Sequence, residues 1–457
     1  DAEIDNALFQ AQKDHEDIED DEFESFIDEK IPKEQEIDIF GQTGLTTCTK
    51  SNKRKFNIPP KSTKEEVINL MGSLPIRIYI GGSAGVGKSV LINAIYQVLL
   101  NYFNEDPGEK NNSVKILLCA PSGKAAFLIG GVTLHTAFAL PITQYGGQMP
   151  ELSADVANTI RESLFELKLL IIDEISMVGS TMFSRVDTRL RQIMGRNLSF
   201  GGVSVLVVGD LYQLPPVMDT HIYLSSKSCT LSFLAENVLW NEFQYFELSE
   251  IMRQKGDKSF TIALNNLARC AMTANDIAII KSRETKEGHV PKDAIRLYPD
   301  NCSVNSFNKM KIDSHEGQSF EFIAKDSILG KISSLAYKVS LKIGINYMIT
   351  TNIDVEDGLV NGACGKLKQI TFIPGTEEAI KIWLDFNNNK IGFEKRRKYI
   401  SYMNENCMEM SLVPISTITV VLNINERMGY QIVRQQFPIT PAEALTIHKS
   451  QGQTYDK

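Results

Sequence analysis

The residues best suited to chemistry lie in one glycine-rich segment, Gly82-Ser83-Ala84-Gly85-Val86-Gly87-Lys88-Ser89. It matches the pattern G-x-x-x-x-G-K-[ST], in which backbone N–H groups wrap the phosphates of a bound nucleotide. In this pattern the lysine reaches the β- and γ-phosphates and the final hydroxyl holds Mg²⁺. The segment therefore predicts a nucleoside triphosphate and Mg²⁺ site made of Gly82, Gly85, Val86, Gly87, Lys88 and Ser89.

Two carboxylates follow an apolar stretch further along the chain. Asp173 and Glu174 come directly after Leu169–Ile172, so a buried strand would carry both to its tip. There Asp173 is placed to bind Mg²⁺ through water, and Glu174 to polarise the water that attacks the γ-phosphate. The acidic first turn of a helix is the alternative interpretation. The phosphate loop upstream favours the catalytic one.

A third polar group ends the next apolar stretch. Gly209–Pro216 follows Val203–Val208 and contains Gln213. A neutral amide at this place is suited to sensing the γ-phosphate through one hydrogen bond. Taken alone, the same peptide is better interpreted as a polar turn before two prolines.

These groups need a scaffold that brings the ends of separate strands together. Short runs rich in Ile, Leu and Val predict buried parallel strands at Ile76–Ile80, Lys115–Ala120, Leu167–Ile172 and Val203–Val208. Helix-length segments lie between them, among them Val90–Phe103 and Thr181–Met194. Alternating strands and helices predict a wound α/β sheet with ligands at the carboxyl ends of its strands.

The chain after Glu247 is less regular. Asp257–Leu267 predicts a helix and Ala294–Tyr298 a strand, whereas residues 331–433 are β-rich with Gly, Asn and Thr punctuation. We interpret this half as a second α/β domain that carries a small barrel-like insertion.

Composition separates a tail from a body. Of the 457 residues, positions 1–40 hold sixteen Asp/Glu and three Lys/Arg, a balance of −13 within a total of −8, which leaves +5 for residues 41–457. The acidic run is expected to be a disordered tail, and the mildly basic body is compatible with binding a phosphate backbone. Seven scattered cysteines without a CxxC pair argue against a disulfide framework or a zinc site. No apolar run approaches the ~18 residues that span a bilayer.

Six segments, in chain order, resemble motifs Ia, II, III, IV and V of one helicase family: Ala120–Ala126 and Thr133–Phe138, Asp173–Met177, Gly209–Pro216, Ile251–Gln254 and Leu445–Thr454. With the phosphate loop, they make about residues 62–457 similar to the Pif/RecD-like DNA helicases of superfamily one, group B. The sequences of residues 209–217 and 250–260 most resemble those of the Helitron-transposon branch of this family.

The resemblance implies two RecA-like domains that clamp ATP between them. It divides the chain into a tail and linker at 1–61, a domain 1A at 62–247 with a 1B wedge near 140–160, and an incomplete domain 2A at 248–457 with a 2B insertion at about 331–435. By position, Arg253 becomes an arginine finger, which in related NTPases accelerates phosphoryl transfer by ~10³–10⁵. A surface arginine is the default interpretation without the other motifs. Gly452 and Gln453 are implied to face the nucleotide.

The resemblance also implies a path for single-stranded DNA. In the first domain it is lined by Pro121, Ser122, Lys124, His135 and Phe138, and in the second by His448, Lys449, Ser450 and Gln451. The rings of His135 and Phe138 would stack on bases with little sequence preference. Phe138 taken alone is more often a core residue than a stacking platform.

Two features depart from the family pattern. A glutamine-bearing segment that reads adenine is expected before the phosphate loop, but residues 67–74 run almost directly into Pro75 and the first strand. The sequence given also stops at Lys457, without the family's motif VI. These departures leave a runner-up hypothesis, a transposon-derived, DNA- or partner-binding remnant with impaired catalysis. A third hypothesis, a P-loop ATPase or kinase of another kind, accounts for the phosphate loop but not for the patterns at 120–138 and 445–454.

The leading hypothesis is an ATP- and Mg²⁺-dependent 5′→3′ DNA helicase acting in DNA repair, recombination, telomere maintenance or transposition. Its expected partners are single-stranded DNA and DNA junctions, with no membrane. A nuclear monomer is expected, with the mitochondrion as the alternative location.

Overall fold

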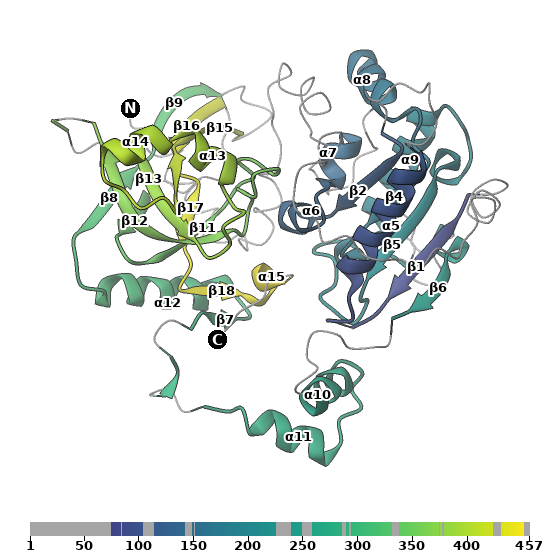
Figure 1. Cartoon of the computed structure of the whole chain (residues 1–457), viewed down its shortest axis with the longest axis horizontal. Coiled ribbons are helices and arrows are strands. Elements are labelled where there is room, and N and C mark those ends of the chain that lie inside the picture. The colour runs from purple at the N-terminus through teal and green to yellow at the C-terminus, as the bar shows by residue number, and fades with distance from the viewer. Residues whose placement is uncertain are drawn as a thin grey trace. The chain divides into compact units, whose positions relative to one another are not determined.

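A computed structural model of the protein describes residues 75–83, 85–103, 114–141, 149, 151–224, 239–248, 258–285, 289–291, 294–330, 338–373, 375–376, 379–423 and 431–451. They fall into two compact units, a first unit within residues 31–289 and a second unit within residues 290–457 (Figure 1). The domain boundaries expected from sequence stay predictions. None of the helices in the described ranges is long and apolar enough to cross a membrane.

A six-stranded parallel sheet forms the centre of the first unit. Its order is β3-β2-β4-β5-β1-β6, with bounds Val132–Thr133, Ile116–Ala120, Leu169–Ile172, Ser204–Gly209, Arg77–Gly81 and Gln244–Glu247. Every residue of β2, β4 and β5 is buried, because helices cover both faces of such a sheet. The four predicted strands, and the wound α/β class, are confirmed.

The helices of this unit follow the strands that they cover. Their bounds are α5 Lys88–Phe103, α6 Gly123–Ile129, α7 Leu134–Phe138, α8 Ala154–Leu164 and α9 Ser180–Met194. In the core, side chains of the sheet pack against aromatic rings of α9 and of the 3₁₀ turn η4 Ser199–Gly202. Two of these rings, Phe183 and Phe200, are fully buried. After β6 come α10 Lys258–Ala268 and α11 Ala274–Lys281, which contact each other. The predicted helices at 90–103, 181–194 and 257–267 are thus confirmed to within two residues.

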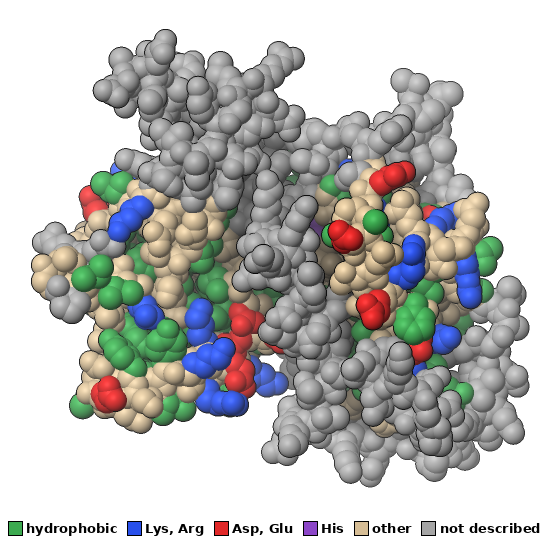
Figure 2. Space-filling view, turned by 90° about the horizontal axis from the view of Figure 1, so that it is seen from above, with side chains coloured by type: hydrophobic (Ala, Val, Ile, Leu, Met, Phe, Trp, Pro, Cys, Tyr) green, Lys and Arg blue, Asp and Glu red, His purple; other side chains and the backbone are tan. Residues whose placement is uncertain are grey.

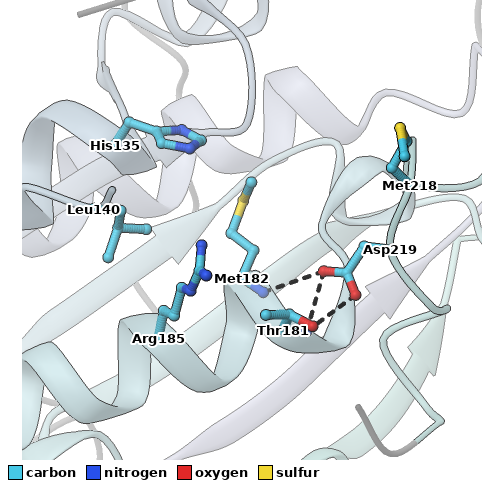
Figure 3. A pocket seen from close by; sticks show the side chains of 7 residues that line it. All are labelled: His135, Leu140, Thr181, Met182, Arg185, Met218 and Asp219. Atoms are coloured by element: carbon cyan, nitrogen blue, oxygen red, sulfur yellow. Dashed lines mark hydrogen bonds between the residues drawn. The ribbon is translucent and has the colours of Figure 1, made fainter. Parts of the chain in front are cut away.

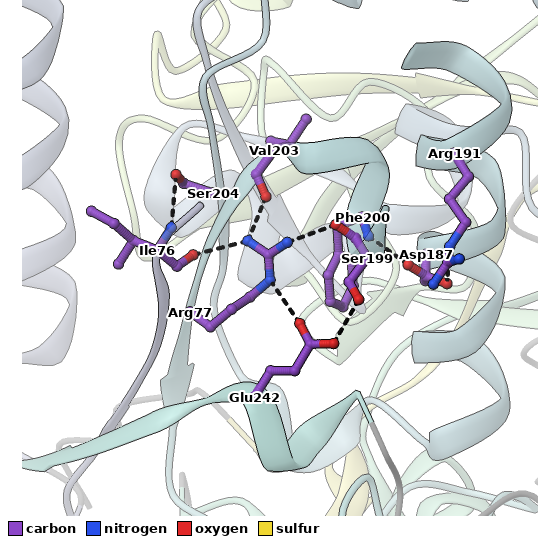
Figure 4. A network of polar contacts seen from close by, with 9 residues as sticks. All are labelled: Ile76, Arg77, Asp187, Arg191, Ser199, Phe200, Val203, Ser204 and Glu242. Carbon is purple, nitrogen blue, oxygen red and sulfur yellow. Dashed lines mark hydrogen bonds and ion pairs between the residues drawn. The ribbon is translucent and has the colours of Figure 1, made fainter. Parts of the chain in front are cut away.

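A buried arginine fastens the start of β1 (Figure 4). Arg77 is 8% exposed, and its guanidinium donates to the carbonyl oxygens of Val203 (2.6 Å) and Ser199 (2.7 Å). It also lies 3.6 Å from the carboxylate of Glu242, in the 3₁₀ turn η6 Trp240–Glu242, and over the ring of Phe200. The strand that leads into the phosphate loop is therefore held to β5, η4 and η6 at once.

The second unit has a small parallel pair and a larger antiparallel insertion. β7 Arg296–Tyr298 pairs in parallel with β18 Ala444–Thr446, beside α12 Asn301–Ser314. The insertion contains a five-stranded sheet in the order β14-β13-β12-β11-β17, with bounds Leu412–Ser416, Ala379–Phe386, Cys364–Phe372, Asn346–Ile349 and Ile439–Pro441.

Two smaller sheets and two short helices complete the insertion. The sheets are β15-β16-β9 and β10-β8, with bounds Ile418–Asn423, Gln431–Gln436, Lys325–Gly330, Lys338–Lys342 and Ser319–Ile323. Between β13 and β14 lie α13 Phe393–Lys398 and α14 Ile400–Glu405. The β-rich character predicted for this region is confirmed. Because neighbouring strands pair antiparallel, short connections suffice between them.

Candidate nucleotide and DNA site

Three neighbouring strands of the first unit end at the same edge of the sheet. β5 pairs in parallel with both β1 and β4, in a register that sets Gly81 opposite Gly209 and Ile172 opposite Val207. The segments that follow these strands carry Lys88, the pair Asp173-Glu174 and Gln213. Residues separated by more than a hundred positions thus meet at one edge, where ligands bind in open α/β sheets.

The phosphate loop connects β1 to the first turn of α5. Gly85 and Gly87 have φ angles of 84° and 91°, which favour glycine at these turns. A Cβ on Gly82 would lie 2.8 Å from the carbonyl oxygen of Leu248, so the close passage of that chain also requires glycine. The ammonium of Lys88 donates to the carbonyl oxygens of Gly82 (2.7 Å) and Ser83 (3.1 Å). Lys88 is therefore folded over the loop in which a phosphate would lie.

The carboxylate of Asp173 ends β4 and is buried, with 7% of its surface exposed. Burial raises the pKa of Asp173, while a backbone hydrogen bond and the positive charge of Lys88 act in the opposite direction. The charge of Lys88 therefore acts on the Asp173 carboxylate. A buried carboxylate that is attracted to a cation is the kind of group that gains from a bound divalent ion. Among the described residues, no cluster of three or more His, Cys, Asp or Glu forms a metal cage.

Glu174 adopts a left-handed conformation, with φ 51° and ψ 46°, at the start of the 3₁₀ turn η3 Ile175–Met177. The turn packs against the end of β5, where a Cβ on Gly209 would lie 2.8 Å from the backbone nitrogen of Ile175. Glycine at 209 therefore lets the turn approach β5. Few non-glycine residues adopt this backbone conformation.

Gln213 is held by the aspartate that precedes it. Its backbone nitrogen donates to the carbonyl oxygen of Asp210 (2.9 Å), and its side-chain amide donates to the Asp210 carboxylate (3.3 Å). Asp210 also accepts from the backbone nitrogen of Tyr212 (3.1 Å). The peptide is thus a hydrogen-bonded turn, as the alternative interpretation held, and it fixes the amide at the nucleotide edge of β5.

Two short helices position the predicted DNA residues of the first unit. Ser122 caps α6 by accepting from the backbone nitrogen of Ala125, and Thr133 caps α7 by accepting from that of Thr136. Both caps satisfy amides that the first helical turn leaves unpaired. The helices then carry Lys124 and His135, while Pro121 and Ser122 stay partly exposed at the end of β2.

His135 opens into a small pocket between α7, α9 and the segment after Gln213 (Figure 3). Its other lining residues are Leu140, Thr181, Met182, Arg185, Met218 and Asp219. Burial lowers the pKa of His135 to about 4, and the positive charge of Arg185 acts in the same direction. The imidazole is therefore neutral near pH 7, with one nitrogen able to donate and the other to accept.

The side chain of Asp219 lines this pocket. Its carboxylate accepts from the backbone nitrogens of Thr181 (3.1 Å), Met182 (3.3 Å) and Thr220 (2.8 Å), and so caps the start of α9. Neither Arg185 nor Asp219 was among the predicted site residues. They belong to segments that no motif pattern links, so only the fold reveals that they face His135.

The predicted stacking role of Phe138 is wrong for this structure. Its side chain is fully buried in the core of the first unit, so neither face of the ring can reach a base. The reason is that α7 has only five residues and turns Leu134, Ala137 and Phe138 towards the core. The alternative interpretation, a core residue, is confirmed.

The second unit presents the segment that resembles motif V. β18 leads into α15 Ile447–Ser450, which Thr446 caps by accepting from the backbone nitrogen of Lys449 (3.4 Å). The buried amide of Asn308 on α12 fixes β18, because it donates to the carbonyl oxygen of Ala444 and accepts from its nitrogen (2.7 Å). The side chain of His448 is exposed, and Lys449, Ser450 and Gln451 are partly exposed. Arg253, Gly452 and Gln453 lie outside the described residues.

Comparison with known sequences points to one helicase family. The model of the PIF1-like helicase family matches residues 61–284. A PIF1 ATP-dependent DNA helicase of Emericella nidulans is 28% identical over 420 residues, which cover 83% of this chain and 54% of that protein. The human PIF1 helicase is 28% identical over 425 residues, covering 88% and 57%. The chain thus spans little more than half the length of these relatives.

Solved structures agree with the sequence comparison. The crystal structure of the Pif1 helicase from Candida albicans has a TM-score of 0.60 at 24% identity and covers 86% of each chain. A Bacteroides Pif1 helicase in complex with ADP-AlF3 and single-stranded DNA has a TM-score of 0.59 at 25% identity, covering 86% of this chain and 84% of that one. The first of these likenesses shows the fold alone, the α/β architecture of Pif1 helicases.

Proposed function

We propose that this chain, which is similar to the PIF1-like helicases, is an ATP-dependent DNA helicase that translocates 5′→3′ along single-stranded DNA. The observation that carries the proposal is the meeting of Lys88, Asp173 and Gln213 at the ends of β1, β4 and β5. A phosphate loop alone occurs in many nucleotide-binding proteins. Its combination with both other groups is suited to ATP hydrolysis that senses the γ-phosphate.

In the proposed reaction, the loop N–H groups and Lys88 hold the β- and γ-phosphates. Ser89 and Asp173 would hold Mg²⁺, which neutralises charge on the transferred phosphoryl group. Glu174 orients the attacking water and accepts its proton. Gln213 responds to the γ-phosphate, and Arg253 supplies the arginine finger. Gly452 and Gln453 are proposed to contact the same nucleotide.

DNA is proposed to bind along Pro121, Ser122, Lys124 and His135 in the first unit and along His448, Lys449, Ser450 and Gln451 in the second. Support comes from the exposure of His448, from the partial exposure of the other seven residues, and from relatives described as bound to single-stranded DNA and as unwinding forked DNA. The ring of His135 offers a face on which a base could stack. ATP-driven opening and closing of the two domains would then move the grips along the strand.

The proposed Helitron affinity rests on the sequences of residues 209–217 and 250–260. A monomeric state and a nuclear or mitochondrial location are proposed together with the helicase function. Repair, recombination, telomere maintenance and transposition are the candidate settings. The runner-up, a remnant that binds DNA without turnover, draws on the missing adenine-reading segment.

Phosphate release, measured with and without single-stranded DNA, tests the ATPase proposal. We expect DNA-stimulated turnover that Lys88→Ala and Arg253→Ala abolish. Lys115→Ala, a lysine of the same unit outside the motifs, serves as the control and should retain activity. DNA binding without turnover would favour the remnant. A protein that shows neither ATP turnover nor DNA binding would contradict both hypotheses.

A further inference from the structure

A cluster of three lysines lies on the insertion of the second unit. Lys395 and Lys398 belong to α13, and Lys381 belongs to β13. Burial lowers the pKa of Lys395. The negative charges of Asp354 and Asp357 act against this lowering, and the positive charges of Lys398 and Lys381 add to it. The charges of Lys398 and Lys381 thus act on Lys395, although those of the two carboxylates act on it more strongly.

The segment that carries Lys395 and Lys398 is strongly basic. Residues 390–398, KIGFEKRRK, hold five basic residues and one acidic residue, a net charge of +4. Arg396 donates to backbone carbonyls of its own loop, and Arg397 pairs with Glu394 (3.3 Å). In the part of the chain that the structure describes, no carboxylate forms an ion pair with Lys395 or Lys398.

The helix that carries these lysines is anchored at its start. The buried carboxylate of Asp357 accepts from the backbone nitrogens of Glu394 (2.8 Å) and Lys395 (2.9 Å). Gly392, with φ 69°, precedes the helix, and a Cβ there would lie 2.5 Å from the side chain of Val413. The start of α13 is therefore fixed against the sheet by a specific acceptor and a glycine contact.

Aromatic rings fix the rest of the helix pair and border the cations. The buried Trp383 stacks on Tyr402 (5.7 Å between centroids, 5° between planes) and meets Tyr399 edge-on. The ammonium of Lys381 lies 5.4 Å from the centre of the Tyr399 ring. Phe393 and Tyr402 are 54% and 37% exposed. Lys381 thus borders the rings of the helix pair, and the face drawn in Figure 2 shows Lys and Arg side chains with Asp and Glu side chains among them.

We propose that Lys381, Lys395 and Lys398, with Phe393 and Tyr402, form a nucleic-acid contact surface on the insertion, in addition to the predicted strand path. The lysines would contact backbone phosphates, and the exposed rings would pack against bases or sugars. Nucleic acid offers phosphates to the cations and flat bases and sugars to the rings, so it uses both features of the surface. The inference rests on the proposed function, because it takes DNA as the substrate.

The test replaces the three lysines by glutamine in the full chain. Each phosphate contact contributes about 0.7 to the slope of log K against log salt for single strands and about 0.9 for duplexes. Loss of three contacts should therefore reduce the magnitude of this slope by about 2 for single-stranded DNA and by about 3 for duplex DNA. The slope is measured with labelled oligonucleotides between about 50 and 200 mM salt. The matched control removes Lys309, Lys311 and Lys338, which belong to α12 and β10 of the same unit. A Lys→Arg triple variant keeps the charge and should retain the parent slope.

The outcomes separate this inference from the proposed function. Equal slopes for the cluster and control variants, with DNA-stimulated ATP turnover intact, would overturn the contact surface alone. Weakened binding to polyglutamate with unchanged DNA binding would assign the surface to an acidic protein and overturn it as well. A parent chain that binds no DNA would remove the proposed function together with this inference. Unchanged Trp383 fluorescence confirms that the variants are folded.

Discussion

Replacing Arg77 by methionine should destabilise the first unit without touching the second. The guanidinium is buried, and its two short hydrogen bonds reach the carbonyl oxygens of Val203 and Ser199. Methionine fills similar space but donates nothing. Both carbonyls and the partly exposed Glu242 would lose their charged donor. Each hydrogen bond to a charged group contributes about 1.5–3 kcal/mol, so the loss of both bonds should cost about 3 kcal/mol or more.

Glu242→Gln provides the matched control. The Glu242 carboxylate is 37% exposed and lies 3.6 Å from Arg77, so its loss should cost less than about 1 kcal/mol. A glutamine oxygen can still accept from the hydroxyl of Ser199, which donates to Glu242 at 2.6 Å. The contrast between the two variants separates the buried hydrogen bonds from the ion pair.

The two tryptophans allow each unit to be followed separately. The chain has only Trp240, in the first unit, and Trp383, in the second. Urea unfolding of the Trp383→Phe protein reports the first unit, and that of the Trp240→Phe protein reports the second. With a slope of about 2–3 kcal/mol per molar urea, Arg77→Met should lower the midpoint seen by Trp240 by about 1–2 M.

The result that would refute this reasoning is equally clear. A shift for Arg77→Met no larger than that for Glu242→Gln would mean that the buried hydrogen bonds contribute little. Equal shifts in both tryptophan signals would mean that the two units do not unfold separately.

Phe138→Ala should destabilise the first unit by about 3–5 kcal/mol in urea unfolding, because the ring is fully buried. A variant with unchanged stability but weaker DNA binding, measured by fluorescence anisotropy, would instead support a stacking role for Phe138. His135 has a pKa of about 4 in the fold against 6.5 ordinarily, so only the unfolded chain takes up its proton between these values. Stability should therefore fall as pH drops from 6.5 towards 4, and urea midpoints at pH 7 and 5 should differ less for His135→Gln than for the parent. Gly209→Ala places a Cβ 2.8 Å from the nitrogen of Ile175 and should slow ATP turnover by roughly tenfold or more, measured by phosphate release, while Gly195→Ala, with open space around it, should not.

Sequence reasoning could single out the parts of the candidate site that depend on local patterns. Lys88 follows from a glycine spacing, and Asp173 from an apolar run that ends in acids. The strand order then brings them together, because parallel strands of a wound sheet present their carboxyl ends at one edge. Those predictions needed no knowledge of distant contacts.

The rest depended on contacts between distant segments. Arg77 finds its acceptors 122 and 126 residues away, and Asp219 caps a helix that begins 39 residues earlier. Nothing in their sequence neighbourhood marks either as structural. Phe138 shows the same limit from the other side, since a five-residue helix is too short to reveal its buried face by periodicity.

Translocation itself is the most direct test of the central claim. A single-stranded oligonucleotide with biotin at one end is blocked by streptavidin, and release of the streptavidin is followed with ATP and Mg²⁺. We predict rapid release from the 3′ end, slow release from the 5′ end, and none with Lys88→Ala. ATP turnover without release from either end, or release from the 5′ end alone, would contradict a 5′→3′ motor.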